Sequence, residues 1–324
     1  PPRSTLDRSS AASDVYKRQS VHILLFFYTD DLNSNRLVTK PMEIIGVGLI
    51  GGSVARSLKK ANFAQEFVGI GRSENNLLRA KELGVIDRWT LNLKEAVMGA
   101  DVIMLATPVT ALNHILPQVA THLRENTIVT DAGSVKGTVA RVASRTLGEG
   151  ISHFVPGHPI AGAEKTGVEA SREDLFQGQK VILTPLSSTA RHAVDRVRKI
   201  WEVTGASVGL MDPDQHDKLL ALTSHLPHAL AFCLVNTLAE QPNADQCYEL
   251  AASGFYDITR IASSDPVMWR DIFLENKYSV LSRLTEYSEN IGRLIQLIET
   301  EDADGLTAEF RKSNETRSLI QKHR

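Results

Sequence analysis

The stretch that decides the fold is Glu43-Ile-Ile-Gly-Val-Gly-Leu-Ile-Gly-Gly-Ser53, in which an apolar run enters a cluster of glycines with G-x-G-x-x-G spacing. In such a turn the first glycine allows a tight bend, the second lets a pyrophosphate approach the backbone, and the third lets the following helix pack closely. The phosphates then bind at the positive end of that helix. The pattern predicts a dinucleotide site; the alternative is a turn whose glycines serve packing only. The residues expected to form the phosphate site are Gly46, Gly48, Leu49, Ile50 and Gly51.

Apolar runs alternate with helical patterns for some 170 residues after this turn begins, which predicts parallel βαβ units covered on both faces. Strands are expected at 42–47, 66–70, 101–106, 127–130, 153–155, 181–184 and 206–209, and helices at 53–60, 77–83, 111–123 and 190–203. From Asp214 onward no strand pattern remains, and helical periodicity covers 216–240, 268–299 and 303–322, with a polar stretch at 251–266. We therefore expect an α/β fold, with a Rossmann-type doubly wound parallel sheet in residues 41–210 and an all-helical domain in residues 211–324.

Residues 1–40 differ from the rest of the chain. The first 19 are polar, rich in Ser and Arg, and follow neither a helical nor an alternating pattern. Residues 11–19 resemble a translated cloning artefact, so we expect this segment to be disordered or non-native and exclude it from the fold.

The composition favours a globular enzyme of the cytoplasm. Hydrophobic residues make up 42% of the chain, and 36 basic against 38 acidic residues give a formal net charge of -2. This balance argues against a general nucleic-acid binder, and the apolar run Val21–Tyr28 is too short to span a bilayer. Cys233 and Cys247 suit a reducing compartment. The helical part has larger apolar faces than a lone small bundle needs, which favours a homodimer.

The tip of the second strand leaves the choice of cofactor open. Rossmann domains that use NAD usually carry an acid there for the ribose 2′-hydroxyl, whereas this chain has Arg72 and Ser73 after a glycine. These two residues would suit the 2′-phosphate of NADP; alternatively, Arg72 stacks on adenine or is solvated. Thr107 and Pro108 end the next long strand, where a turn either lines the cofactor crevice or only closes the strand.

Two segments near the same sheet edge carry polar groups suited to proton transfer. Gly133 and Ser134 follow the strand at 127–130, and Ser134 offers either a reactive-site hydroxyl or a cap for the next helix. His158 lies between a glycine and a proline, which would hold the imidazole rigidly as a proton acceptor; the alternative is a core histidine. Glu164 follows six residues later.

The helical part contributes a second polar group. Ser224, His225 and His228 lie within five residues, and a helix would place the two histidines on one face. A metal pair there lacks a third ligand nearby in sequence, so no metal is expected. Arg260 suits a carboxylate ligand, unless it only pairs with Asp257. Trp269 follows a helix start and is expected in the core or in a pocket wall.

Taken together, GVGLIGGS, DAGSVKG, GHPIAGAEKTGVEAS, KVILTP, TSHLPHALAF and FYDITRIASSDPVMWRDIF resemble, in order, the prephenate/arogenate dehydrogenase family of tyrosine biosynthesis. The resemblance covers about residues 42 to 300. It implies a Rossmann domain and a helical dimerisation domain with the active site between them. It also implies oxidative decarboxylation of prephenate or arogenate, with hydride transfer to NAD or NADP.

The resemblance also implies roles for individual residues. His158 would accept the substrate hydroxyl proton, and Ser134 would bond that hydroxyl and orient His158. Arg260, positioned by Asp257, would bind a substrate carboxylate. His228 would lie in the substrate cleft with Ser224 and His225 nearby, and Glu164 would gate or shape that cleft.

Two other functions compete with this expectation. A β-hydroxyacid dehydrogenase would need a catalytic Lys with an Asn partner in the helical part, which we do not find in the sequence. A dinucleotide-binding sensor without catalysis would not need His158, Ser134 and Arg260 together. Neither the choice between prephenate and arogenate nor inhibition by tyrosine follows from the sequence.

Overall fold

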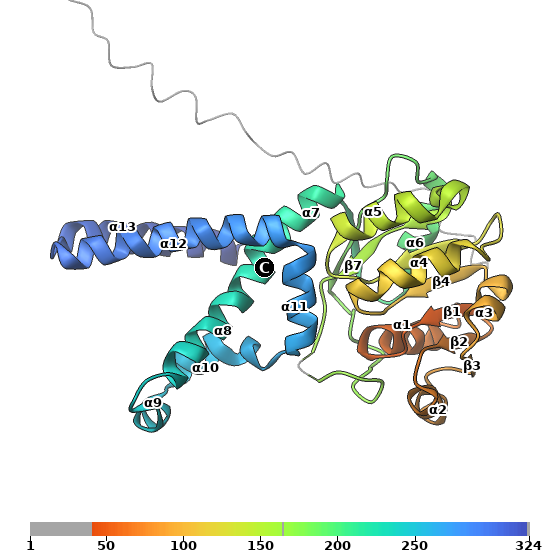
Figure 1. Ribbon diagram of the computed structural model, residues 1–324, viewed down its shortest axis with the longest axis horizontal. Helices are drawn as coiled ribbons and strands as arrows, with labels where there is room; N and C mark the ends of the chain where they lie inside the picture. The colour runs from red at the N-terminus through yellow and green to blue at the C-terminus, as the bar shows by residue number, and fades with distance from the viewer. Residues whose placement is uncertain (1–40, 164, 323–324) are drawn as a thin grey trace, which may run out of the picture. The chain divides into compact units, whose positions relative to one another are not determined.

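The computed structural model describes residues 41–322 except Glu164. Its centre is a six-stranded sheet in which every neighbouring pair is parallel (Figure 1). The strand order is β3 (Arg88–Thr90), β2 (Phe67–Ile70), β1 (Met42–Ile45), β4 (Val102–Leu105), β5 (Ile128–Asp131) and β6 (Phe154–Val155). The order reverses direction beside β1, which is the topological switch of a Rossmann fold.

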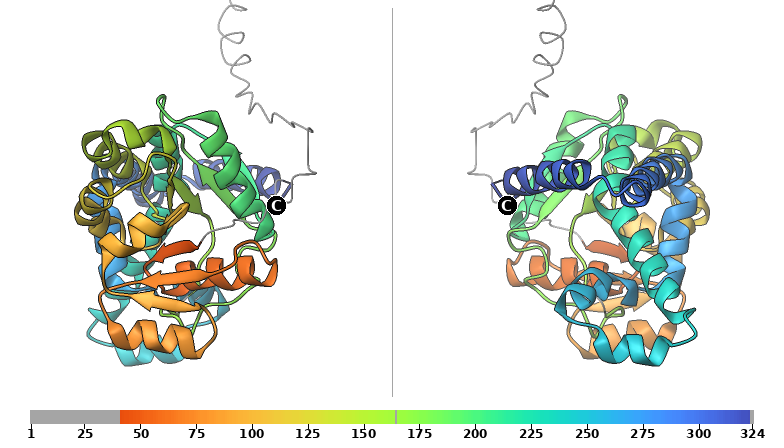
Figure 2. Two further views of the ribbon diagram at one scale, coloured as in Figure 1. Left: turned by 90° about the vertical axis from the view of Figure 1, so that its right-hand side faces the viewer. Right: turned by 90° about the vertical axis from the view of Figure 1, so that its left-hand side faces the viewer.

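Helices pack on both faces of this sheet (Figure 2), as the continuous apolar strands require. Neighbouring residues of β1 enter opposite cores: Ile44 faces one apolar cluster and Ile45 the other. One face is covered by α1 (Leu49–Lys60), α2 (Glu74–Glu82) and α6 (Arg191–Val203). The other is covered by α3 (Leu93–Gly99), α4 (Leu112–Ala120) and α5 (Lys136–Thr146). Short 3₁₀ turns lie at η1 (Val109–Ala111) and η2 (Gly148–His153).

A second, smaller sheet follows the first. It consists of β7 (Gly157–Pro159), β8 (Lys180–Leu183) and β9 (Ser207–Leu210), with β7 antiparallel and β9 parallel to β8. Pairing of His158 with Ile182 in this sheet fixes the backbone that carries the histidine.

The rest of the described chain is helical. Its elements are α7 (Pro213–Leu220), the π-helical turn η3 (Ala221–His225), α8 (Leu226–Ala239), α9 (Ala244–Leu250), α10 (Ser253–Thr259), η4 (Arg260–Ser263), α11 (Pro266–Glu275), α12 (Lys277–Glu299) and α13 (Ala303–Gln321). The last two lie side by side as a hairpin (Figure 1). Large apolar side chains remain exposed here, among them Leu250, Tyr278, Ile298, Phe310 and Leu319.

One described helix, Pro213–Ala239, is long and apolar enough to cross a membrane, and 28% of its most apolar window is buried. Length and composition alone are weak grounds for a span, because helices of soluble proteins pass the same test. This helix also contains a π-helical turn and buries His216, Asp217 and His225, all three of which make polar contacts within the chain.

The fold class is as expected, with local corrections. The first helix begins at Leu49 rather than Ser53, and the second begins at Glu74 rather than Leu77. Strands β3 and β7 and helix α3 were not predicted, and the stretch at 251–266, for which no element was predicted, contains α10 and η4. The prediction for residues 1–40 lies outside the described residues.

Candidate active site

The glycine turn after β1 has the geometry that its spacing predicts. Gly46 has a φ of +97°, and a Cβ there would lie 2.6 Å from the Ala106 carbonyl oxygen. A Cβ on Gly51 would lie 2.2 Å from the carbonyl oxygen of Gly46, so α1 can approach the turn only because this residue is glycine. Around Gly48 a Cβ would meet nothing within 4 Å. The backbone at Gly48 and the N-terminus of α1, at Leu49 and Ile50, is thus open to a phosphate group.

The tip of β2 places Arg72 and Ser73 at the surface. The Ser73 hydroxyl caps α2 by accepting a hydrogen bond from the Asn76 backbone amide at 3.3 Å. Asn76 in turn donates to the Val47 carbonyl oxygen inside the glycine turn, at 2.9 Å. Ser73 therefore has a structural role that was not predicted, and the part of both residues in holding a 2′-phosphate stays a prediction.

The turn after β4 also reaches this edge. Thr107 is half-buried, with its hydroxyl oxygen buried and without a partner among the described residues, and Pro108 is exposed. Thr110, two residues on, donates from its hydroxyl to Asp271 Oδ2 of α11 at 2.7 Å. This hydrogen bond joins the edge of the large sheet directly to the helical part.

A fully buried ion pair fixes the segment that carries His158. Lys136 Nζ donates to Asp131 Oδ2 at 2.5 Å and to the Gly157 carbonyl oxygen at 2.6 Å. The same carboxylate accepts from the backbone amides of Gly133 and Gly157. Because these contacts satisfy both buried charges, β5, the start of α5 and β7 are held together one residue before His158.

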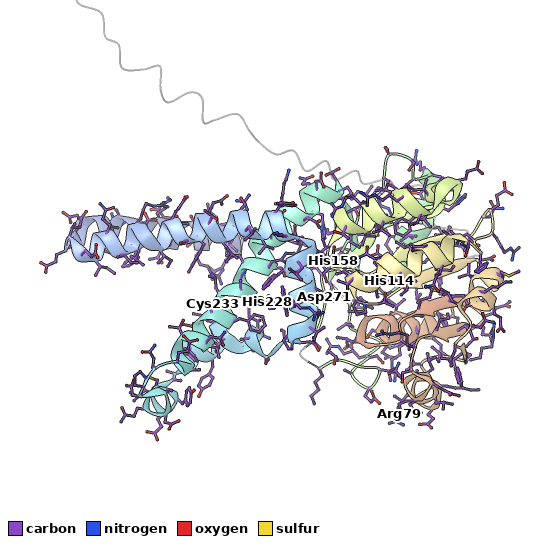
Figure 3. All side chains as sticks on the ribbon, viewed as in Figure 1. Arg79, His114, His158, His228, Cys233 and Asp271 are labelled. Atoms are coloured by element: carbon purple, nitrogen blue, oxygen red, sulfur yellow. The ribbon has the colours of Figure 1, made fainter. Side chains whose placement is uncertain are left out.

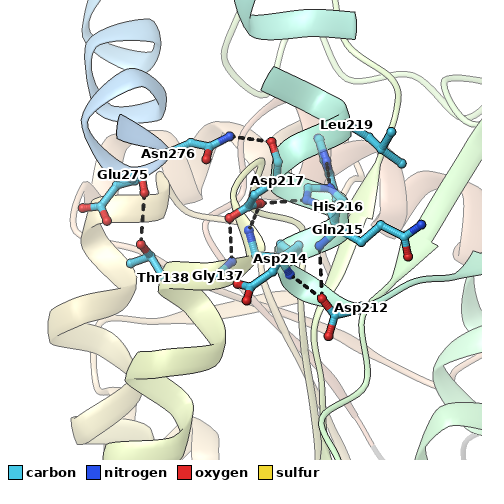
Figure 4. Close-up of polar contacts among 12 residues, drawn as sticks. Gly137, Thr138, Asp212, Asp214, Gln215, His216, Asp217, Leu219, Glu275 and Asn276 are labelled. Carbon is cyan, nitrogen blue, oxygen red and sulfur yellow. Dashed lines mark hydrogen bonds and ion pairs between the residues drawn. The ribbon is translucent and has the colours of Figure 1, made fainter. Parts of the chain in front are cut away.

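The His158 ring contacts a second histidine, and this pair was absent from the sequence prediction. His158 Nδ1 lies 2.8 Å from His216 Nε2, and His216 Nδ1 lies 2.8 Å from Asp217 Oδ1. Figure 4 shows the Asp217 carboxylate beside His216 and the start of α5. His216 is fully buried and Asp217 is 7% exposed. The only sequence signal was an adjacent His-Asp pair on a helix, with no indication of its distant partner.

Burial determines the protonation of His158. The pKa of His158 lies well below the usual value, first because the ring is desolvated and then because His216, Lys136 and His225 surround it. The ring is therefore neutral at physiological pH and able to accept a proton. This state is the one that a general base requires.

Ser134 comes just before α5 in the chain but does not cap this helix. The N-cap position of that helix is Val135, without a side-chain hydrogen bond. The Asp217 carboxylate caps it instead, accepting from the Lys136 and Gly137 amides at 2.8 Å each. Ser134 is half-buried, and its hydroxyl has no hydrogen bond to any described residue. Its expected contact with the substrate hydroxyl stays a prediction.

The helical part brings an aromatic and basic group to the same region. The rings of His228 and Trp269 stack, with centroids 3.6 Å apart. Burial lowers the pKa of His228; the hydrogen bond to the Ser224 backbone opposes this shift, and the positive charge of Arg260 adds to it. His228 Nδ1 donates to the Ser224 carbonyl oxygen at 2.9 Å. Figure 3 shows His228 on α8, beside α11.

His225 has a different environment from the expected one. It is 1% exposed, and its Nδ1 accepts from Asn276 Nδ2 at 3.2 Å, while the same amide group donates to the Asp217 carbonyl oxygen. Its ring meets Trp269 edge-on at 6.0 Å. Burial lowers the pKa of His225 to about 4. His225 thus packs behind the tryptophan as a neutral core residue.

Hydrogen bonds and ring contacts connect the His158 ring to part of the helical group. His158 bonds His216, and the backbone oxygen of the next residue, Asp217, accepts from Asn276. Asn276 also bonds His225, whose ring meets Trp269, and Trp269 stacks on His228. Asp257 lies exposed on α10, three residues before Arg260. Glu164 lies outside the described residues. No group of three or more possible metal ligands is found in the described part of the chain.

Comparison with known proteins assigns the chain to a family. A prephenate dehydrogenase nucleotide-binding domain model matches residues 54–210, and a prephenate dehydrogenase dimerization domain model matches residues 212–312. The chain belongs to the prephenate dehydrogenase family.

Relatives in this family share most of their length with the chain. It is 37% identical to a Bacillus subtilis prephenate dehydrogenase, covering 85% of this chain and 74% of that protein. It is 36% identical to a Zymomonas mobilis cyclohexadienyl dehydrogenase, covering 87% and 97%.

Solved structures of the family have the same fold. An Aquifex aeolicus prephenate dehydrogenase, solved in complex with hydroxyphenyl propionate and NAD+, gives a TM-score of 0.82 at 38% identity, covering 88% of this chain and 99% of that one. A Synechocystis arogenate dehydrogenase gives 0.74 at 28% identity, covering 86% and 99%. The family resemblance and the fold class expected from the sequence are confirmed.

Proposed function

We propose that this protein is a prephenate dehydrogenase of tyrosine biosynthesis, which converts prephenate to 4-hydroxyphenylpyruvate and CO2 with NAD+ as hydride acceptor. One observation supports the proposal: in a chain of this family, contacts lead from His158 through Asn276 and His225 to Trp269 and His228, and the charge of Arg260 acts on His228. Family membership and the relatives' names support the reaction class.

The residues present fit a dinucleotide at the glycine turn. Open space around Gly48 and the free N-terminus of α1 would accept the pyrophosphate, and Thr107 and Pro108 would border the crevice. When bound there, NAD+ supplies the acceptor for the hydride that leaves the hydroxyl-bearing ring carbon. Arg72 and Ser73 at the tip of β2 keep NADP+ as a second cofactor to test.

In the proposed reaction, side chains of this protein transfer one proton and bind one substrate carboxylate. Neutral His158 takes the substrate hydroxyl proton as the carbonyl forms, and Ser134 bonds the same hydroxyl. Loss of CO2 from the resulting dienone leaves a phenolate, to which His158 returns the proton. Arg260, with Asp257 nearby, holds a substrate carboxylate, while Trp269, His228 and Ser224 border the cleft and His225 supports it from behind. Glu164 would gate the cleft.

The family model supports a homodimer through the helical part. We place the boundary between the two halves at residues 210 and 211, where β9 ends, and we expect the protein to act in the cytoplasm as a biosynthetic enzyme. A partner copy would cover the apolar side chains exposed on α8, α12 and α13.

The test is a two-by-two assay of prephenate and arogenate against NAD+ and NADP+, followed by the absorbance of the reduced nicotinamide. Turnover of prephenate with NAD+ is expected. No turnover with either substrate under either cofactor would exclude the function, and turnover of arogenate alone would replace prephenate as the substrate.

Replacing the base tests its role. His158→Asn should lower kcat at least ~100-fold, because a positioned base contributes about 10²–10⁴-fold. The NAD+ affinity of this variant, measured by calorimetry, should stay within about twofold of wild type, because the substitution affects only the chemical step. Near-normal turnover would remove His158 from the mechanism.

Replacing the cation tests substrate binding. Arg260→Ala should raise KM for prephenate about tenfold or more while changing kcat less, because a bond made equally in ground and transition states affects mainly KM. An unchanged KM would contradict this assignment.

A further inference from the structure

The side chains behind His158 form a continuous line that ends at a backbone-bound carboxylate. His158 Nδ1, His216 Nε2, His216 Nδ1 and Asp217 Oδ1 follow one another at successive distances of 2.8 Å (Figure 4 shows the Asp217 end). Asp217 itself is fixed by the Lys136 and Gly137 amides at the start of α5. The line therefore begins at a rigid helix end and finishes at the base.

The hydrogen positions along this line follow from donor and acceptor chemistry. An ionised carboxylate can only accept, so His216 carries its hydrogen on Nδ1 and leaves Nε2 as an acceptor. The contact between the rings then requires His158 to donate from Nδ1. In a neutral imidazole with a hydrogen on Nδ1, the lone pair available to a substrate is on Nε2.

We propose that His216 and Asp217 are positioning residues for the reaction, which hold His158 in the tautomer whose Nε2 is free to accept the substrate proton. This inference rests on the proposed function for its kinetic consequence, but the hydrogen positions can be measured without any substrate. The proton that His158 takes makes an imidazolium, which still donates from Nδ1 to His216. The proton returns from Nε2 to the phenolate oxygen, so the pair exchanges none in the net reaction.

Other polar groups lie near these side chains, but their hydrogen bonds go to other partners. Lys136 Nζ bonds Asp131 and the Gly157 carbonyl oxygen rather than the His158 ring. His225 is occupied by Asn276, whose amide group also bonds the backbone of Asp217. Among the described residues, His216 is the one whose side chain bonds His158 Nδ1.

Asp217 caps α5 as well, so a variant is needed that separates capping from positioning. His216→Phe removes both ring nitrogens and keeps an aromatic ring in a fully buried position, while Asp217 retains its two backbone bonds. His216→Gln replaces the ring by an amide whose oxygen can accept from His158 Nδ1. His114→Phe, at an exposed position on α4, is the matched control.

The first measurement uses the wild-type protein, labelled with ¹⁵N at histidine, and assigns His158 and His216 by comparison with single variants. Two-bond nitrogen–proton spectra report which ring nitrogen carries the hydrogen. We expect hydrogen on Nδ1 of both residues. A hydrogen on Nε2 of neutral His158 overturns the proposal, whatever the activity of the enzyme.

The second measurement is the pH profile of kcat. His216→Phe should lower kcat about 10- to 100-fold at every pH above neutrality, within the range that a well-positioned base contributes, because the ratio of neutral tautomers does not depend on pH. In His216→Phe, KM and NAD+ affinity should stay within about twofold of the wild-type values. His216→Gln should recover most of the lost kcat. The control His114→Phe should have the kcat of wild type.

A merely structural role for His216 gives a different result. Removing His216 moves the acid limb of kcat to higher pH in either case, because His216 helps to lower the pKa of His158. With a merely structural role, kcat at high pH would stay at the wild-type value. That outcome in His216→Phe overturns the proposal. If the variant does not fold, the tautomer spectrum of the wild type still decides. Absence of turnover in the wild type would instead count against the proposed function.

Discussion

At the scale of single residues, Glu43 is the least expected group in the structure. It lies on β1, is 1% exposed, and neither carboxylate oxygen has a hydrogen-bond partner among the described residues. Burial raises its pKa to about 8, while the charge of Arg88 partly opposes the shift. The folded protein therefore holds a largely neutral carboxyl near neutral pH.

This shift predicts how stability depends on pH. Between the unfolded pKa of about 4.5 and the folded pKa of about 8, the unfolded chain loses the proton that the folded chain keeps, so stability falls as pH rises across that window. Glu43→Gln should remove this loss. Its melting temperature relative to wild type should increase from pH 5 to pH 8.5 in thermal scans, and an equal difference at both values would show that Glu43 does not titrate as described.

The glycines of the turn make a second residue-scale prediction. Gly51→Ala should destabilise the protein strongly, because its Cβ would lie 2.2 Å from a backbone oxygen, whereas Gly48→Ala should leave the melting temperature near wild type. Calorimetry should show a weaker NAD+ affinity for Gly48→Ala, since the added methyl group enters the open space. Equal stability losses would contradict the different roles of these glycines.

At the scale of elements, α11 is tied to η1 by the Thr110–Asp271 hydrogen bond. Thr110→Val should lower the free energy of unfolding by about 1 kcal/mol. Asp271 would keep its hydrogen bonds from Arg270 but lose the one from the Thr110 hydroxyl. Thr121→Val, which removes an exposed hydroxyl bonded within its own helix end, is the control. Denaturant titration measures the free energy of unfolding of both variants. A smaller decrease in Thr110→Val than in Thr121→Val would show that the Thr110–Asp271 hydrogen bond does not stabilise the contact between α11 and η1.

Most of the central strands could be predicted from the sequence, because apolar runs of four to six residues specify them. The exceptions have physical reasons. The strand β3 has only three residues, none fully buried, and so lacks an apolar run. The cap of α5 comes from Asp217, some 80 residues away, and no local pattern encodes it. For the same reason His158 and Arg260 were recognisable by motif, whereas His216, 58 residues from its partner, was not.

At the scale of the whole molecule, exposed Ile291, Ile295 and Ile298 lie on one face of α12. The double substitution Ile295→Asp and Ile298→Asp should convert the expected dimer to a monomer, because it would bury charges in an apolar interface. Glu289→Lys, on the opposite face of the same helix, is the control. Sedimentation equilibrium measures both, and an unchanged dimer would place the interface elsewhere.

The Asp217 carboxylate has a consequence for how this chain can be divided. It comes from a helix C-terminal to β9, yet it closes the first turn of α5 and supports the ring behind His158. If the chain is cut at residue 210, the nucleotide-binding fragment keeps His158 but loses His216 and Asp217, the two side chains proposed to position it. A chimera joining that fragment to a relative's helical fragment should work only if the donor brings an equivalent His-Asp pair in register.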